Sequence, residues 1–154
     1  MQVTKNFHLS ELLHSNTAVR LGIKNIPSQD HQANLITACH ALFQPMREAL
    51  GQSVLISSGY RSPAVNKAVG GSATSAHSVG YAIDFISPKF GTPREIATFL
   101  AKELPTRGIK FDQIILEFDS WVHIGFKTRD GRQRNEVLTA KKVAGVTRYF
   151  KGVV

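Results

Sequence analysis

Two separated stretches of this chain carry side chains that bind transition metals, and bringing them together constrains the fold more than any other feature. Residues 75–84 contain His77 and end in Asp84, and residues 120–124 contain His123. Two imidazoles and one carboxylate form a common ligand set for catalytic zinc, with a water in the fourth position. Zinc lowers the pKa of such a water to about 7, so a nucleophile exists at neutral pH. We therefore predict one zinc per chain.

Each of these three residues also has a purely structural interpretation. A single histidine on an apolar strand, such as His77 or His123, is more often a core residue than a metal ligand. Asp84 has a similar alternative as a buried acid whose hydrogen bonds are satisfied. Spacing alone does not choose between these interpretations, so the neighbouring motifs become decisive.

Three motifs follow one another along the chain. Residues 57–62 read Ser-Ser-Gly-Tyr-Arg-Ser, residues 75–84 follow the pattern SxHxxGxAxD, and residues 121–123 read Trp-Val-His. In order and spacing they resemble the zinc D-Ala-D-Ala carboxypeptidases and L-Ala-D-Glu endopeptidases, a group that includes phage endolysins. The resemblance covers about residues 7–126. It implies a zinc site in a cleft, and as substrate the peptide stem of bacterial peptidoglycan.

The same motifs suggest which residues meet the substrate. Arg61 stands where the family places an arginine that contacts the substrate carboxylate or the developing oxyanion, and its permanently charged, planar group suits either role. A structural ion pair is the alternative. Tyr60 is expected to line the same cleft. Trp121 shares strand parity with the last histidine and either walls the pocket or packs in the core. Ser75 either orients the loop of His77, as outer-shell residues do, or is a plain turn residue.

The general base is expected to be Glu117, with Asp119 as the second choice. Many members of the resembling family carry an acid three residues before the last histidine, but this position is Ser120 here. A two-residue turn would put Glu117 on the face away from that histidine, whereas a three-residue loop that pairs it with Trp121 puts it on the same face. We favour the longer loop because burying the carboxyl group of Glu117 in an apolar strand costs free energy, so the residue is expected to have a function there. Asp119 then has the chemistry of an ordinary turn residue.

Hydrophobic periodicity predicts helices early in the chain and a β-hairpin late. Helices are expected at residues 9–13 with Ser10 as a possible cap, from Ser28 to Gly51 with an irregularity at Pro45, at 63–68, and at 92–104 with Pro105 as its stop. The segment between the first two helices is expected to be a loop. Strands are expected at 54–57, 81–86, 111–118 and 121–126. These elements predict an α+β domain with helices packed on a central, mainly antiparallel sheet.

The length of 154 residues suits a single domain. We expect a motif-bearing core at about residues 7–126 and a basic extension at 127–154, in which two segments are expected to be strands or a helix and a strand. The single cysteine, Cys39, is expected to be buried and unpaired. No stretch has the roughly 20 apolar residues of a membrane span, and no signal-peptide core is visible. We therefore expect a monomer made in the cytoplasm, in a host cell if the protein is a phage lysin, which reaches the wall by another release route.

The formal net charge of +8 favours anionic partners, and much of the excess positive charge falls late in the chain. The cations of this basic extension are Lys127, Arg129, Arg132, Arg134, Lys141, Lys142, Arg148 and Lys151. They either attract the anionic cell envelope or form a solvated face. Nucleic acid is not expected as a partner, because neither a zinc-finger pattern nor an RNA-recognition motif is present.

The expected function is therefore zinc-dependent hydrolysis of an amide bond in the stem peptide, as an L-Ala-D-Glu endopeptidase of the phage endolysin type. A D-Ala-D-Ala carboxypeptidase is the alternative within the same class. An alternative from another class is a metal-containing module that binds the cell wall and has lost catalysis. A basic nucleic-acid-binding protein is a further alternative, supported by charge alone.

Overall fold

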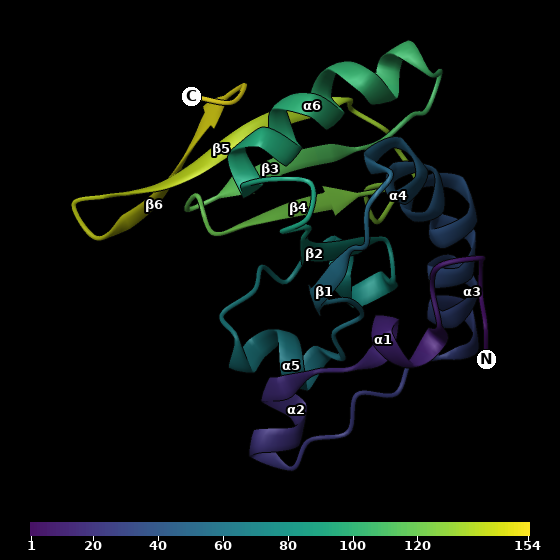
Figure 1. Cartoon of the computed structure of the whole chain (residues 1–154). Helices are drawn as coiled ribbons and strands as arrows, with labels where there is room; N and C mark the ends of the chain where they lie inside the picture. Colours follow the sequence, from purple (N-terminus) through teal and green to yellow (C-terminus); the bar gives the residue numbers. More distant parts are fainter.

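A six-stranded sheet forms the centre of the protein, in a computed structural model that describes all 154 residues (Figure 1). The strands lie in the order β1-β2-β4-β3-β5-β6. Their bounds are Leu55–Ser58 (β1), Ala82–Ile86 (β2), Gln113–Glu117 (β3), Trp121–Gly125 (β4), Glu136–Val143 (β5) and Val146–Lys151 (β6). Only β3 and β5 are parallel neighbours, and every other pair is antiparallel. The predicted α+β domain with a mainly antiparallel sheet is therefore confirmed.

The first helix, α1 (Leu9–Leu13), begins two residues earlier than a Ser10 cap would allow. His8 is the N-cap, and its Nδ1 accepts a hydrogen bond from the Ser10 N–H at 3.1 Å. The Glu11 carboxylate accepts in turn from the His8 N–H at 2.7 Å, which completes a capping box. The suggested Ser10 cap is therefore wrong, because the Glu11 carboxylate lies in the N3 position relative to His8 and not to Ser10.

A second short helix, α2 (Asn16–Leu21), lies in the segment that was expected to be a loop. Ser15 caps its start by accepting from the Ala18 N–H at 3.1 Å, and Gly22 ends it in the left-handed conformation. Ala18 is its single buried residue. A helix with so little buried surface has no apolar periodicity in its sequence, so the expectation of a loop was wrong.

The long early helix is continuous but changes its winding in the middle. It begins after the Ser28 cap as α3 (Gln29–Ala38), passes through a π-helical segment at Cys39–Phe43, and ends as α4 (Gln44–Leu50) at Gly51. The irregularity predicted at Pro45 is confirmed, because a proline has no N–H for the α-helical bond to the preceding turn.

The Cys39 side chain is fully buried and unpaired, as predicted. Burial raises the pKa of its thiol to about 11. Because the thiolate is the reactive form of cysteine, this residue is not suited to nucleophilic catalysis.

Two later helices complete the fold. Helix α5 (Pro63–Ala68) begins at Ser62, whose hydroxyl accepts from the Val65 N–H at 3.3 Å. Helix α6 (Pro93–Thr106) begins with the predicted capping box. The expected stop at Pro105 is wrong by one residue, since Pro105 lies within the last turn, where it removes one hydrogen bond, and the helix ends at Thr106. None of the helices is both long and apolar enough to cross a membrane.

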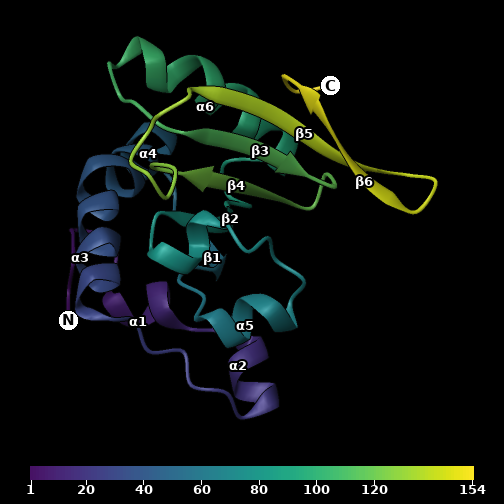
Figure 2. The same ribbon diagram turned by 180° about the vertical axis from the view of Figure 1, so that it is seen from behind.

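The core lies between the sheet and the helices that cover one of its faces. Side chains alternate along a strand, so one row of each strand faces the helices and the next row faces the opposite side. The helix-facing row of β2 and β4 contains Phe85, Val122 and Ile124, which are fully buried in one cluster with α6 and α4 residues. Figure 2 shows from behind how α6 runs along β3 and β5. The other sheet face is therefore the one available for a functional site.

Strands β5 and β6 form an antiparallel hairpin, which we call the C-terminal hairpin. Its turn contains Ala144 and Gly145, both with positive φ, as a tight two-residue hairpin turn requires. The pairing of β5 with β3 joins this hairpin to the sheet, so both uncertain segments of the extension are strands. The hairpin projects past the ends of β3 and β4 (Figures 1 and 2).

Candidate metal centre

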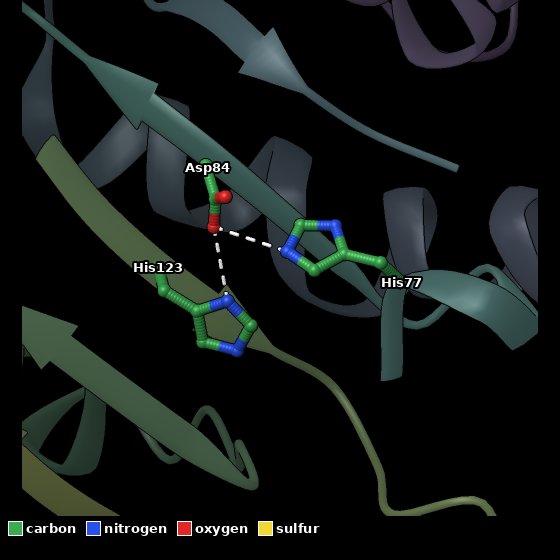
Figure 3. A group of neighbouring side chains, drawn as sticks. All are labelled: His77, Asp84 and His123. Atoms are coloured by element: carbon green, nitrogen blue, oxygen red, sulfur yellow. Dashed lines mark hydrogen bonds and ion pairs between the residues drawn. The ribbon is translucent and has the colours of Figure 1, made fainter. Parts of the chain in front are cut away.

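The fold brings the three predicted ligands together (Figure 3). Asp84 and His123 alternate with the helix-facing residues of β2 and β4, so they lie on the sheet face opposite α6. His77 lies in a single 3₁₀ turn, Ala76–Val79, just before β2. Asp84 on β2 and His123 on β4 are directly opposite each other in the antiparallel register. Antiparallel partners point to the same face with their Cβ atoms about 4.5–5.5 Å apart, so the register itself places these two side chains together.

Asp84 is the centre of the group. Its Oδ1 lies 3.1 Å from Nε2 of His77 and 3.0 Å from Nδ1 of His123. The three side chains are buried, and their ligand atoms all lie within 4.8 Å of one another. Zinc bonds of about 2.0–2.2 Å to nitrogen and oxygen are compatible with such separations. The donor set and its spacing therefore fit a zinc ion.

A backbone carbonyl group fixes the orientation of the His77 ring on the side that faces away from Asp84. Its Nδ1 lies 2.8 Å from the Gly59 carbonyl oxygen, and because a carbonyl can only accept, this nitrogen carries the proton. Nε2 is then the free nitrogen, and it points to Asp84. A metal-binding histidine usually has such an outer hydrogen bond. Gly59 is itself packed tightly against α1, because a Cβ at this position would lie 2.2 Å from the Leu12 carbonyl oxygen, so a larger residue does not fit there.

Ser75 holds the start of the 3₁₀ turn. Its hydroxyl accepts a hydrogen bond from the His77 N–H at 3.2 Å, as an N-cap does. The residue thus lies where an orienting role for the His77 loop requires it, although it touches neither imidazole.

Charge and burial act in opposite directions on the acid of this group. Burial alone would raise the pKa of Asp84, but the charges and hydrogen bonds of His77 and His123 outweigh it and hold the pKa well below its usual range. Burial lowers the pKa of His77, whereas the hydrogen bond and charge of Asp84 overcome burial at His123 and raise its pKa. An ionised carboxylate and a neutral imidazole are the forms that bind a metal.

Arg61 extends from the segment after β1 toward the same carboxylate. Its Nη2 donates to Oδ2 of Asp84 at 3.2 Å, and its Nε donates to the Ser58 hydroxyl at 3.0 Å. The ion pair that was the structural alternative is therefore present. The Nη1 atom has no protein partner, and the side chain lines the cleft beside the metal group. Arg61 thus retains donors for a substrate.

Glu117 lies on the same sheet face as the metal group. The connection between β3 and β4 is a three-residue loop that pairs Glu117 with Trp121, as we predicted, and it contains Phe118 and Asp119 in left-handed conformations. Burial raises the pKa of Glu117, and repulsion from Asp84 raises it further. A carboxylate with a raised pKa beside a cleft has the properties of a general base.

Asp119, the second choice for the base, lies elsewhere. Its two carboxylate oxygens accept hydrogen bonds from Nε and Nη2 of Arg94 at 2.9 and 3.0 Å. This pairing with the first turn of α6 lowers the pKa of Asp119, and the residue does not line the cleft.

Of the two aromatic residues expected to line the cleft, Trp121 does so and Tyr60 lies in the core. Trp121 lines the cleft, and its indole N–H is buried without a hydrogen-bond partner. Tyr60 does not line the cleft: it is 3% exposed, belongs to the core cluster, and its ring packs at 5.9 Å from the ring of His31. The expected role of Tyr60 in substrate binding is corrected by this placement, because in an extended segment Tyr60 and Arg61 point to opposite sides.

The cleft over this face has a volume of about 1180 Å³ and more polar than apolar residues around it. One wall comes from the loop that precedes His77, and a second from the connection between β4 and β5. Arg129 in this connection donates to the Ala73 carbonyl oxygen at 2.6 Å, which links these two walls. The C-terminal hairpin contributes Lys142, Thr147 and Tyr149. Their positions were missed because Lys142 had no signal in the sequence except its charge, and Thr147 and Tyr149 had none.

The family model of peptidase M15 matches residues 5–125 of the chain. The match contains all three predicted metal ligands, together with Arg61 and Glu117, and it ends before the C-terminal hairpin. No curated protein matches the chain.

Proposed function

Because the chain belongs to the peptidase M15 family and is therefore a metallopeptidase, we propose that it hydrolyses an amide bond in the stem peptide of peptidoglycan. The observation that carries the proposal is the buried group of His77, Asp84 and His123 inside the matched region. Peptidases of this family depend on zinc. In this chain Nε2 of His77, a carboxylate oxygen of Asp84 and Nδ1 of His123 would hold the ion.

The chemistry divides between the ion and the side chains around it. A zinc ion bound here would lower the pKa of a water molecule and polarise the scissile carbonyl. The Glu117 carboxylate accepts a proton from the attacking water and later delivers it to the nitrogen of the leaving amine. Such positioned proton transfer contributes about 10²–10⁴-fold to a rate. The raised pKa of Glu117 suits a group that must take up and release one proton near neutral pH.

The free donors of Arg61 face the place where the substrate lies, so this residue binds either a substrate carboxylate or the oxyanion that develops on the attacked carbonyl. A donor that stabilises such an oxyanion contributes most when it is fixed in advance. The hydrogen bonds from Arg61 to Asp84 and Ser58 fix it. Trp121 forms the wall beside Glu117, and Ser75 keeps the His77 turn in place.

Within this class we propose an L-Ala-D-Glu endopeptidase that acts as a phage-type endolysin after release to the wall. The supporting observation is the length of the cleft, which continues beyond the metal group to the C-terminal hairpin and so has room for substrate on both sides of a cleaved bond. A D-Ala-D-Ala carboxypeptidase, which removes one terminal residue, is the second candidate. The high positive charge of the basic extension supports attraction to the anionic envelope.

Hydrolysis of purified peptidoglycan tests the proposal directly. The zinc-loaded protein should release soluble fragments, a chelator should stop the release, and added zinc should restore it. Mass spectrometry of the fragments identifies the cleaved bond, because new N-terminal D-Glu indicates the endopeptidase and free D-Ala indicates the carboxypeptidase. Binding to the wall without any released fragment would instead indicate a module that has lost catalysis.

A further inference from the structure

The C-terminal hairpin places three polar side chains on the wall of the cleft. Ala140 of β5 pairs with Glu117 on one side and with Tyr149 on the other, so Tyr149 is on the same sheet face as the proposed base. Lys142 follows Ala140 by two residues and pairs with Thr147, which puts both on that face too. All three line the cleft, and all three lie outside the region matched by the family model.

Lys142 differs from the other cations that line the cleft. The four arginines each have a partner: Arg61 pairs with Asp84, Arg129 with the Ala73 carbonyl, Arg132 with Asp130, and Arg134 with Asp112. The Lys142 ammonium has no hydrogen-bond or ion-pair partner. Its nearest assigned contact is the Phe118 ring, whose centroid lies 5.6 Å from Nζ. This cation is therefore free to bind an anion that enters the cleft.

The neighbours of Lys142 extend this set of free donors. Neither the Tyr149 hydroxyl nor the Thr147 hydroxyl makes a hydrogen bond within the protein. One ammonium and two hydroxyls on one wall match the needs of a single carboxylate, whose two oxygens accept hydrogen bonds. The phosphates of an anionic polymer would need a track of several cations, and the paired arginines do not offer one.

We propose that Lys142, with Tyr149 and Thr147 beside it, binds a free carboxylate of the substrate peptide at a distance from the cleaved bond and thereby determines specificity. The inference rests on the proposed function, since stem peptides carry carboxylates away from their scissile amides. Because the group contacts a part of the substrate that does not react, its binding energy is the same in the ground state and the transition state. Such uniform binding lowers KM and leaves kcat unchanged.

The test compares Lys142→Met with the wild type on two soluble stem peptides, one with free carboxylates and one with these groups amidated. KM for the carboxylate peptide should rise about fivefold, as expected for an exposed charge pair, with kcat unchanged. The amidated peptide should show no difference between the two proteins. Lys102→Met, on the exposed side of α6, removes the same charge far from the cleft and should behave as the wild type.

Lys141→Met makes the comparison sharper, because Lys141 is the next residue on β5 and points to the other face of the hairpin, where its Nζ lies over the Phe150 ring. The proposal requires a clearly smaller rise in KM for this variant than for Lys142→Met. An equal rise in both would show a general effect of charge and would overturn the subsite. A defect of Lys142→Met on wall material alone would assign the anion to a wall phosphate and would also overturn it.

Binding separates the subsite from the catalytic proposal. Trp121 is the single tryptophan of the chain and lines the cleft, so its fluorescence reports binding without turnover. If the wild type binds the carboxylate peptide more tightly than Lys142→Met but cleaves nothing, the subsite stands and the proposed hydrolysis fails. If the wild type cleaves the peptide and both proteins bind it equally, the hydrolysis stands and the subsite fails.

Discussion

On the side of the cleft that carries the metal group, the three predicted ligands are buried and joined by hydrogen bonds, whereas the wall from the C-terminal hairpin is largely exposed and its polar groups have no partner. Asp84 pairs with both His77 and His123, His77 is also held by the Gly59 carbonyl, and the rings of His77 and His123 pack edge to face with their centroids 5.1 Å apart. On the hairpin, Tyr149 is 57% exposed and its hydroxyl has no protein partner. The first arrangement holds ligand atoms in one geometry before the metal arrives, and the second leaves groups free for a variable partner.

This difference separates two tasks that a peptidase must perform. Chemistry at the bond requires fixed positions, because small displacements of reacting groups reduce rates strongly. Recognition of the rest of the substrate tolerates exposed and mobile groups, since each contributes only modest binding energy. Substitutions on the metal side should therefore abolish activity or metal binding, and those on the hairpin side should change substrate preference.

The largest effects are expected at the ligands themselves. His77→Ala, Asp84→Ala and His123→Ala should each abolish both stoichiometric zinc and wall hydrolysis, because a site with three protein ligands cannot lose one of them and hold the ion. Elemental analysis after dialysis measures the zinc content, and circular dichroism checks the fold. Full zinc content in all three variants would remove the site from consideration.

Glu117→Gln should keep its zinc and lose about 10²–10⁴-fold in activity, because it removes a proton acceptor and no ligand. Asp119→Asn is the matched control, with the same change of acid to amide two residues away, at a carboxylate paired with Arg94 outside the cleft. It should keep its activity. The reverse pattern of activities would move the base to Asp119.

Much of the fold could be predicted because its signals are local, and the metal ligands could be predicted because three short motifs carry the resemblance to a known family. The Ser28 cap, the helix irregularity at Pro45 and the strands around the metal group follow from short patterns. The position of Glu117 was predicted from the free-energy cost of burying its carboxyl group in an apolar strand. This cost favoured the three-residue loop, which places Glu117 on the face of the metal group.

The elements that were missed depend on information that is not local. Helix α2 buries a single side chain, so its pattern is indistinguishable from a loop. Tyr60 lies in the core because the chain before Arg61 crosses α1, and its N–H donates to the Leu12 carbonyl at 2.9 Å. The hairpin reaches the cleft through the parallel pairing of β3 and β5, and a parallel pairing between distant segments leaves no short pattern in the sequence.

A smaller effect than at Glu117 is expected from Arg61→Lys, which keeps the positive charge but loses the planar guanidinium group with its several N–H donors. Activity should fall by about 10²-fold or less, in the range of a lost oxyanion donor, with zinc content unchanged because Arg61 is not a ligand. Zinc loss in this variant would mean that the ion pair with Asp84 serves to hold the ligand in place, and the substrate role would then be wrong.

The smallest expected effect concerns the charge of the basic extension. If it attracts the anionic envelope, added salt should reduce activity on whole wall material more steeply than activity on a neutral, soluble stem peptide. Salt should matter more for the wall because attraction between exposed charges acts over a distance and is screened over about 8 Å at physiological ionic strength. Groups inside the cleft instead act on the substrate at contact. Rates on both substrates, measured across a salt series, decide the matter. Equal salt dependence would leave the basic extension as a solvated surface, with substrate recognition confined to the cleft.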